Sequence, residues 1–253
     1  MEYIKGEHAD FPYQLNKIPR VLQLVVAGKG FFAGGMFKNL FTDTPARDLD
    51  IWAPTEDALN QIALELGDLK CSKEGYEAQL HYKTDKARGY TLVDSNEKPV
   101  CKFELVNSRS GGPKQVLDEF DFSITKFAYV PVQAKDGNKE QVGVLGNGKC
   151  YYHPTFFRDL VLKRLVLENP NKERPLDSPI NTWNRALKYT RYGYNLCRES
   201  KKYLLRQVHS QMEDFEKVTG LAADIRRSDP TQPSDLTELL DFGIVDSLYA
   251  GKD

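Results

Sequence analysis

The stretch Gly34-Gly35-Met36-Phe37-Lys38-Asn39-Leu40, followed by Asp48-Leu49-Asp50-Ile51-Trp52, decides the fold that we expect for this chain. Its pattern predicts a strand that ends in two glycines, a short helix, and a second strand. Side chains two residues apart on a strand share a face, so Asp48 and Asp50 are expected side by side, roughly 7 Å apart. Two carboxylates that face one way repel each other unless a cation lies between them. Glycines before a helix let a phosphate approach backbone N–H groups at its positive end. The combination predicts a site for a metal-bound triphosphate; the alternative is a turn and a surface strand with two solvated aspartates.

The composition bounds the kinds of protein that this chain can be. Its 253 residues are enough for one large domain or two small ones. The 35 basic and 36 acidic side chains leave a net charge of −1, which neither indicates nor excludes a nucleic-acid partner. No apolar run approaches the length of a membrane span and no secretory segment is present, so we expect a cytoplasmic protein with no membrane partner. The four cysteines are too far apart for a zinc pattern: Cys71, Cys101, Cys150 and Cys197. In a cytoplasmic protein we expect their thiols to be reduced.

The hydrophobic pattern changes near residue 154, and this change predicts two domains, 1–153 and 154–253. In the first, residues 1–18 are expected to be irregular. The expected strands are 30–33, 47–53, 90–93 and 100–106, the expected helices are 19–27, 36–41 and 55–69, and 122–132 fits either. In the second, the expected helices are 155–167, 182–208 and 235–242. The predicted fold class is therefore α+β: a small mixed sheet with flanking helices, followed by a helical C-terminal part.

A third acidic residue is needed if Asp48 and Asp50 hold metal, because two divalent ions about 4 Å apart require more than two carboxylates. Glu104 is the best candidate, since it is an acid within the otherwise mostly apolar stretch 100–106. The alternative is an edge-strand glutamate that faces water. Mg²⁺ suits oxygen ligands and substrate phosphates, and Mn²⁺ is the expected substitute.

Three separate segments resemble one known family. They are 34–40 with 47–51, then Asp121-Phe122-Ser123-Ile124-Thr125-Lys126-Phe127-Ala128-Tyr129, then Arg185-Ala186-Leu187-Lys188-Tyr189-Thr190-Arg191-Tyr192. In order and spacing they resemble the nucleotidyltransferase superfamily typified by DNA polymerase beta, and more narrowly the head and neck of class II CCA-adding enzymes and bacterial poly(A) polymerases. The resemblance covers about residues 20–200.

This resemblance implies a nucleotidyltransferase head over 1–153 and a helical neck-like domain over 154–253. It implies transfer of a nucleoside monophosphate from a nucleoside triphosphate, such as ATP, to a hydroxyl, with a tRNA-like RNA 3′ end as the first-ranked acceptor. Asp48, Asp50 and Glu104 would be the catalytic metal ligands. The implied nucleotide contacts are Gly34, Gly35, Lys38, Asp121, Arg185, Lys188 and Arg191. The last three lie three residues apart, so on a helix they form one basic stripe, for which a solvated face is the alternative.

The chain departs from the family pattern at three places. Lys38-Asn39 replaces Arg-Asp, and Glu119-Phe120 replaces a pair of arginines. Asn181-Thr182 replaces an acidic pair before Arg185, and in the family an Asp of that pair and an Arg read the incoming base. Lysine keeps the charge of arginine but loses its bidentate fork. Two alternatives to an RNA-directed enzyme stay open, and these departures motivate the second of them. One is nucleotidylation of a small molecule or a protein, and the other is a catalytically inactive protein that binds a nucleotide or a partner.

Overall fold

The computed structural model describes residues 2–45, 48–69, 75–108, 111–136, 139–168 and 178–219. The chain divides after Phe157 into two compact units, and each is considered by itself below. The predicted boundary at residue 153 falls within the first unit. None of the described helices has the length and apolar content that a membrane-spanning helix needs.

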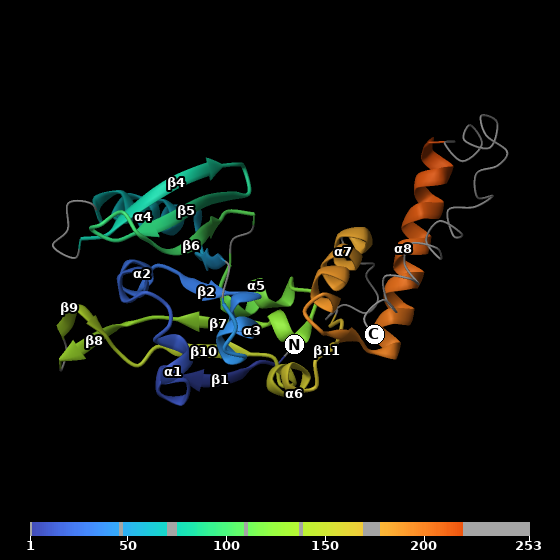
Figure 1. The fold of residues 1–253 in the computed structure, drawn as a ribbon, viewed down its shortest axis with the longest axis horizontal. Helices are drawn as coiled ribbons and strands as arrows, with labels where there is room; N and C mark the ends of the chain where they lie inside the picture. The colour runs from blue at the N-terminus through green and yellow to red at the C-terminus, as the bar shows by residue number, and fades with distance from the viewer. Residues whose placement is uncertain are drawn as a thin grey trace. The chain divides into compact units, whose positions relative to one another are not determined.

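The first unit is built on one mixed sheet of eight described strands (Figure 1). In their order across the sheet, the strands are β1 (Ile4–Glu7), β10 (Lys149–Tyr152), β7 (Phe127–Val130), β2 (Phe31–Ala33), β3 (Asp48–Trp52), β6 (Pro99–Val106), β5 (Ala87–Val93) and β4 (Glu77–Lys83). Only β3 and β6 are parallel, and the other neighbouring pairs are antiparallel. A separate hairpin joins β8 (Gln133–Asp136) to β9 (Lys139–Leu145).

Short helices flank this sheet, as the sequence predicts. They are α1 (Pro12–Leu15), α2 (Arg20–Val26), α3 (Met36–Phe41), α4 (Glu56–Asp68) and α5 (Pro113–Asp118). The start of α4 follows from a local signal, because the Thr55 hydroxyl accepts a hydrogen bond from the Ala58 backbone N–H at 3.2 Å. The predicted α+β class, with a mixed sheet and flanking helices, is confirmed.

Strand β3 alternates between two environments. Leu49 and Ile51 are buried, and they lie in register with Phe103 and Leu105 of β6, which are buried too. This apolar face continues into β5, where Tyr90 stacks on Phe103 with ring centroids 5.1 Å apart. The aspartates of β3 therefore belong to the opposite face of the sheet.

The segment 122–132, which fits either helix or strand in the sequence, forms a 3₁₀ turn (Ser123–Thr125) and then β7. Lys126 lies between them and is fully buried. Its ammonium donates hydrogen bonds to the backbone oxygens of Leu117 at 2.9 Å and Asp118 at 3.4 Å. These oxygens are at the C-terminal end of α5, where a cation is favourable. The lysine thus ties α5 to the start of β7.

Two predictions of local structure, for residues 1–18 and 155–167, are wrong. Residues 1–18 contain β1 and α1, and β1 pairs with β10 through Ile4 opposite Tyr152. The helix expected over 155–167 stops at Val161, because the chain turns at Lys163, whose φ is +52°, and forms β11 (Arg164–Leu165). The helix expected over 235–242 and Cys71 lie outside the described residues.

The described part of the second unit follows α6 (Phe156–Val161), which crosses the division between the units. It contains β11, α7 (Pro179–Thr190), β12 (Asn195–Leu196) and α8 (Arg198–Thr219). The single helix predicted over 182–208 is therefore wrong. Gly193 has φ +81°, a conformation that ends a helix, and Asn195 and Leu196 then pair in parallel with β11.

Candidate functional site

Three carboxylates gather on one face of the parallel pair β3 and β6. Asp50 lies directly opposite Glu104, and Asp48 lies opposite Lys102. Neighbouring strands are about 4.8 Å apart, so Glu104 is nearer to Asp50 than Asp48 is, which lies roughly 7 Å along the same strand. Asp48 is exposed, and Asp50 and Glu104 are half-buried, so water and ions reach this group. The structure thus brings together, on one open face, the three residues that the sequence predicts as metal ligands.

Gly34, in the loop before α3, lies close to the Asp50 carboxylate. Its φ is +111°, and a Cβ built on it would lie 3.0 Å from the Asp50 Oδ2. The backbone is also fixed, since the Gly34 N–H donates to the Phe127 oxygen at 3.1 Å. A side chain at residue 34 would therefore be strained and would crowd the carboxylate. Gly35 follows as the N-cap of α3, which has only six residues.

Lys38, predicted to contact the triphosphate, is only 7% exposed in α3. Its ammonium donates to the Asn39 side-chain oxygen, and the Asn39 amide donates to the Pro45 oxygen at 2.8 Å. The ammonium is therefore turned toward its own helix and the loop after it. Its contact with a nucleotide stays a prediction.

The segment around Asp121 lies beside the glycine loop. Phe120, immediately before it, would come within 3.6 Å of a Cβ on Gly34, and its ring meets that of Trp52 edge to face at 5.8 Å. Asp121 itself is half-buried. The second family-like segment is thus adjacent to the first, with an aromatic ring where the family has an arginine.

The basic stripe belongs to the second unit. Arg185, Lys188 and Arg191 are exposed on α7 and just after it, and Trp183 and Ala186 are buried on its other side. The Arg185 guanidinium also lies 3.3 Å from the Thr182 hydroxyl. The predicted helix face is present, and its role toward a nucleotide stays a prediction.

Tyr82 is a member of this site that the sequence pattern does not reveal. A β-bulge between Leu80 and Tyr82 places Tyr82 opposite Gly89, which itself lies opposite Glu104. A Cβ on Gly89 would lie 2.1 Å from Cε1 of the Tyr82 ring, so the ring lies directly over the glycine. The one available signal is the glycine inside a strand, which often marks a close approach.

The Tyr82 hydroxyl reaches the carboxylates. A hydrogen bond to Glu104 raises the pKa of Tyr82 to about 12, with further contributions from desolvation and from the negative charges of Glu104, Asp48 and Asp50. A phenolate there would add a fourth negative charge. Tyr82 is therefore a neutral donor to Glu104 at ordinary pH.

The donor set suits a hard divalent cation, because carboxylate and hydroxyl oxygens are the ligands that Mg²⁺ and Mn²⁺ prefer. Among the described residues, however, no three His, Cys, Asp or Glu side chains stand close enough together to hold one ion. Glu104 lies beside the Tyr82 side chain, whose ring covers Gly89, the strand partner of Glu104. The oxygen chemistry thus fits a metal, and the side chains would have to turn to converge on it.

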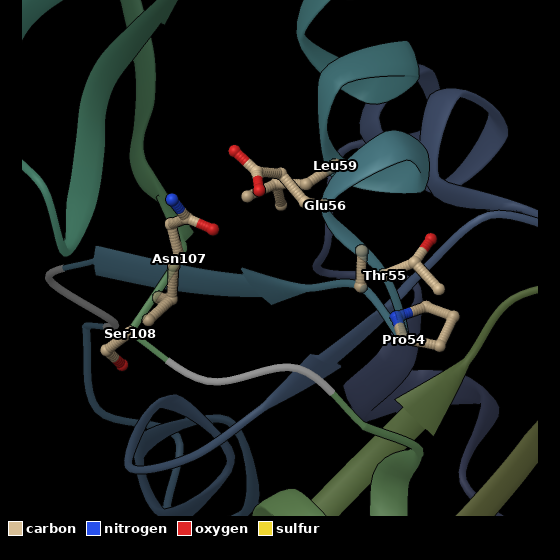
Figure 2. Close-up of a pocket in the computed structure, with 8 residues that line it drawn as sticks. Pro54, Thr55, Glu56, Leu59, Asn107 and Ser108 are labelled. Atoms are coloured by element: carbon tan, nitrogen blue, oxygen red, sulfur yellow. The ribbon is translucent and has the colours of Figure 1, made fainter.

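A cavity of about 460 Å³ opens at the C-terminal ends of the same two strands (Figure 2). The side chain of Asn107 faces Glu56 and Leu59 across it. The cavity is lined by residues after β3, at the start of α4 and at the end of β6: Ala53, Pro54, Thr55, Glu56, Leu59, Val106, Asn107 and Ser108. The cavity begins three residues beyond Asp50, so it lies near the carboxylates but does not contain them.

Solved structures share this fold. A CCA-adding enzyme with ATP superposes with a TM-score of 0.59 at 14% identity, over 99% of this chain and 58% of that one. The Thermotoga maritima CCA-adding enzyme complexed with tRNA gives 0.57 at 15%, over 99% and 57%. An apo tRNA-processing enzyme gives 0.51 at 17%, over 88% and 57%. The chain thus spans less than two thirds of these enzymes, and the likeness establishes the fold.

No curated protein sequence matches the chain. The sequence pattern of one family, Gabija anti-defense 2 (Gad2), matches residues 6–163, which is more than half of the chain. The match contains both segments that surround the carboxylates, 34–50 and 121–129. The resemblance to nucleotidyltransferases, seen in the sequence, agrees with the fold of the solved structures. The chain belongs to the Gabija anti-defense 2 family.

Proposed function

We propose that this protein is a metal-dependent nucleotidyltransferase that moves a nucleoside monophosphate from a nucleoside triphosphate to an acceptor hydroxyl. The observation that carries the proposal is the register of β3 and β6, which aligns Asp50 with Glu104 and keeps Asp48 on the same open face. The fold shared with CCA-adding enzymes supports it. The predicted division into a nucleotidyltransferase head and a helical neck is part of the same proposal.

Asp48, Asp50 and Glu104 are the proposed ligands of Mg²⁺ or Mn²⁺. Such ions offset the charge of a triphosphate and of the leaving pyrophosphate. The acceptor oxygen attacks the α-phosphorus and forms a new P–O bond. The bond from the α-phosphorus to the bridging oxygen breaks, and pyrophosphate leaves. Glu104, whose strand partner Gly89 lies under the Tyr82 ring, is proposed to take the acceptor proton.

The proposed nucleotide contacts begin with the loop beside Asp50. Gly34 and Gly35 keep the loop beside Asp50 free of side chains. Asp121 lies in the neighbouring segment, and Lys38 is the cation of α3. The exposed basic stripe of the second unit is proposed as a further nucleotide-binding surface: Arg185, Lys188 and Arg191.

An RNA 3′ end is the first proposed acceptor, because solved neighbours are described in complex with tRNA. The chain spans just over half of those enzymes, so the acceptor does not follow from them.

A protein hydroxyl is the second candidate. The family name describes opposition to a defence system, and a modified protein is one way to disable it. The specific observation in its favour is that the phenol ring of Tyr82 lies over Gly89, the strand partner of Glu104. A protein that only binds a nucleotide or a partner would label neither acceptor.

The test is incubation with each labelled nucleoside triphosphate, Mg²⁺ or Mn²⁺, and either total cell RNA or total cell protein. The wild type is compared with Asp48→Asn/Asp50→Asn, and exposed Asp85→Asn is the matched control. We expect transfer by the wild type and the control and none by the double variant. Transfer that persists in the double variant would remove the proposed mechanism, and the class of the labelled product identifies the acceptor.

A further inference from the structure

Two departures from regular strand structure place Tyr82 on the carboxylate face. On a regular strand, Tyr82 would share a face with Leu80, on the side of Tyr90 rather than of Glu104. The bulge moves it to the other face, and Gly89 leaves room for its ring. A bulge interrupts the hydrogen-bond ladder and an interior glycine weakens a strand, so neither is explained by the stability of the sheet. Together they bring one phenol to one carboxylate.

The oxygen of Tyr82 is in the position that an acceptor would need. The ring of Tyr82 lies over Gly89, which pairs directly with Glu104, the proposed base. Its hydroxyl interacts with Glu104 and with the charges of Asp48 and Asp50, the proposed metal ligands. A general base must be within hydrogen-bond reach of the proton that it removes. Tyr82 is also 43% exposed, so a nucleotide attached to its oxygen can extend into solvent.

We propose that Tyr82 is itself an acceptor: the protein transfers a nucleoside monophosphate to the phenolic oxygen of its own Tyr82. This inference rests on the proposed function and deepens it, because it names a tyrosine hydroxyl as a class of acceptor that the site accommodates. The side chain reaches Glu104 from β4, across β5, so the transfer is intramolecular.

The chemistry balances without a further reactant. The phenolic oxygen of Tyr82 attacks the α-phosphorus of the nucleoside triphosphate and forms a phosphodiester bond. The bond between that phosphorus and the bridging oxygen to the β-phosphorus breaks, and pyrophosphate carries away its electron pair. The phenolic proton passes to Glu104 and then to water. The product is an O-nucleotidyl tyrosine, which no longer donates a hydrogen bond to Glu104.

The experiment incubates the full chain with α-labelled nucleoside triphosphates and Mg²⁺ or Mn²⁺, with no other acceptor. We expect label on the chain, an intact-mass increase of one nucleoside monophosphate, and its assignment to Tyr82 by peptide fragmentation. Phosphodiesterase should remove the added mass. Parallel reactions contain total cell RNA or protein, so that transfer to other acceptors is measured in the same experiment.

Two variants separate the acceptor from the fold. Tyr82→Phe removes the oxygen and keeps the ring. Gly89→Ala keeps the phenol but puts a methyl group where the ring lies, so the exposed side chain must swing away from Glu104. We expect both to lose the label on the chain while circular dichroism and the unfolding midpoint stay those of a folded protein. Tyr13→Phe, at a tyrosine that is 64% exposed elsewhere, should keep it.

Contact between Tyr82 and Glu104 can also be measured by NMR in the absence of nucleotide and metal. In protein carrying ¹³C at tyrosine Cζ, the Tyr82 signal should shift in Glu104→Gln and in Gly89→Ala, and an unchanged signal contradicts the contact. If added RNA or protein is labelled and the chain is not, the inference fails and the proposed function stands. Label on the chain that survives in Tyr82→Phe overturns the choice of residue, and the absence of label everywhere contradicts both proposals.

Discussion

The two faces of β3 and β6 have the same backbone and opposite uses. On one face, Leu49 and Ile51 pack in register with Phe103 and Leu105, away from water. On the other, Asp48, Asp50 and Glu104 lie together where water and ions reach them. The difference teaches that burial of the apolar face stabilises the fold, whereas the carboxylates of the polar face are expected to contribute little to stability. Substitutions on the two faces should therefore separate folding from transfer.

The largest effect on stability is expected from the apolar face. Phe103 is 1% exposed and stacks on Tyr90, so Phe103→Ala should lower the free energy of unfolding by about 3–5 kcal/mol. Chemical denaturation measures this. Its neighbour Lys102 is exposed on the other face, and Lys102→Ala should change the free energy by less than about 0.5 kcal/mol. Equal losses at the two residues would contradict the division between the faces.

A smaller loss of stability is expected at Lys126, a fully buried cation before β7. Lys126→Met keeps the length of the side chain but leaves the Leu117 and Asp118 oxygens without its ammonium. The Leu117 oxygen still accepts from the Phe120 N–H at 3.3 Å, so what is lost is hydrogen bonding from a charged donor, worth roughly 1.5–3 kcal/mol, and denaturation should show a loss in this range. Stability equal to that of the wild type would mean that the lysine is not needed to hold α5.

The buried thiol of Cys150 should make stability depend on alkaline pH. Burial raises the pKa of Cys150 to about 12, from an ordinary value of 9.0. Below pH 9 the thiol is protonated whether folded or unfolded; above it only the unfolded chain ionises, so stability falls as pH rises toward 12. At pH 10 the loss should be about 1 kcal/mol. Denaturation at pH 8 and pH 10, compared with Cys150→Ala, measures it; an equal loss in the variant would exclude this thiol.

The smallest effect on stability is expected on the carboxylate face. Asp50→Asn removes a charge from a group of three, so its free energy of unfolding should stay within about 0.5 kcal/mol of the wild type. Transfer of label should nevertheless fall on the order of a thousandfold, because metal stabilisation of charge is worth several kcal/mol. A strongly destabilised Asp50→Asn would show that the aspartate holds the fold rather than a ligand.

Features with a local signal were predictable from the sequence. The Thr55 cap predicts the start of α4, and alternation in β3 predicts that Asp48 and Asp50 share a face, as the burial pattern bears out. Features that depend on distant pairing were not predictable. Strand β1 needs Tyr152 as a partner, far along the chain, and β4 is an exposed edge with no buried alternation.

Part of the candidate site could not be predicted for a related reason. Tyr82 reaches Glu104 only through a bulge and a glycine on another strand, and neither changes the periodicity of its own segment. The prediction of a single long helix is wrong at Gly193. The amphipathic pattern continues on both sides of this glycine and therefore predicts one helix, whereas the chain turns there. Roles assigned by resemblance, such as those of Lys38 and Asp121, stay predictions.

Gly34 has a consequence for how freely this protein can vary. Its backbone angle excludes most side chains, and the Asp50 oxygen stands 3.0 Å from where any Cβ would begin. Alanine relieves neither constraint, and asparagine, which tolerates the angle better, still brings the same Cβ. A library with all twenty amino acids at residue 34, selected for transfer, should therefore return glycine alone, whereas the same library at exposed Gly67, where nothing lies within 4 Å, should return many residues.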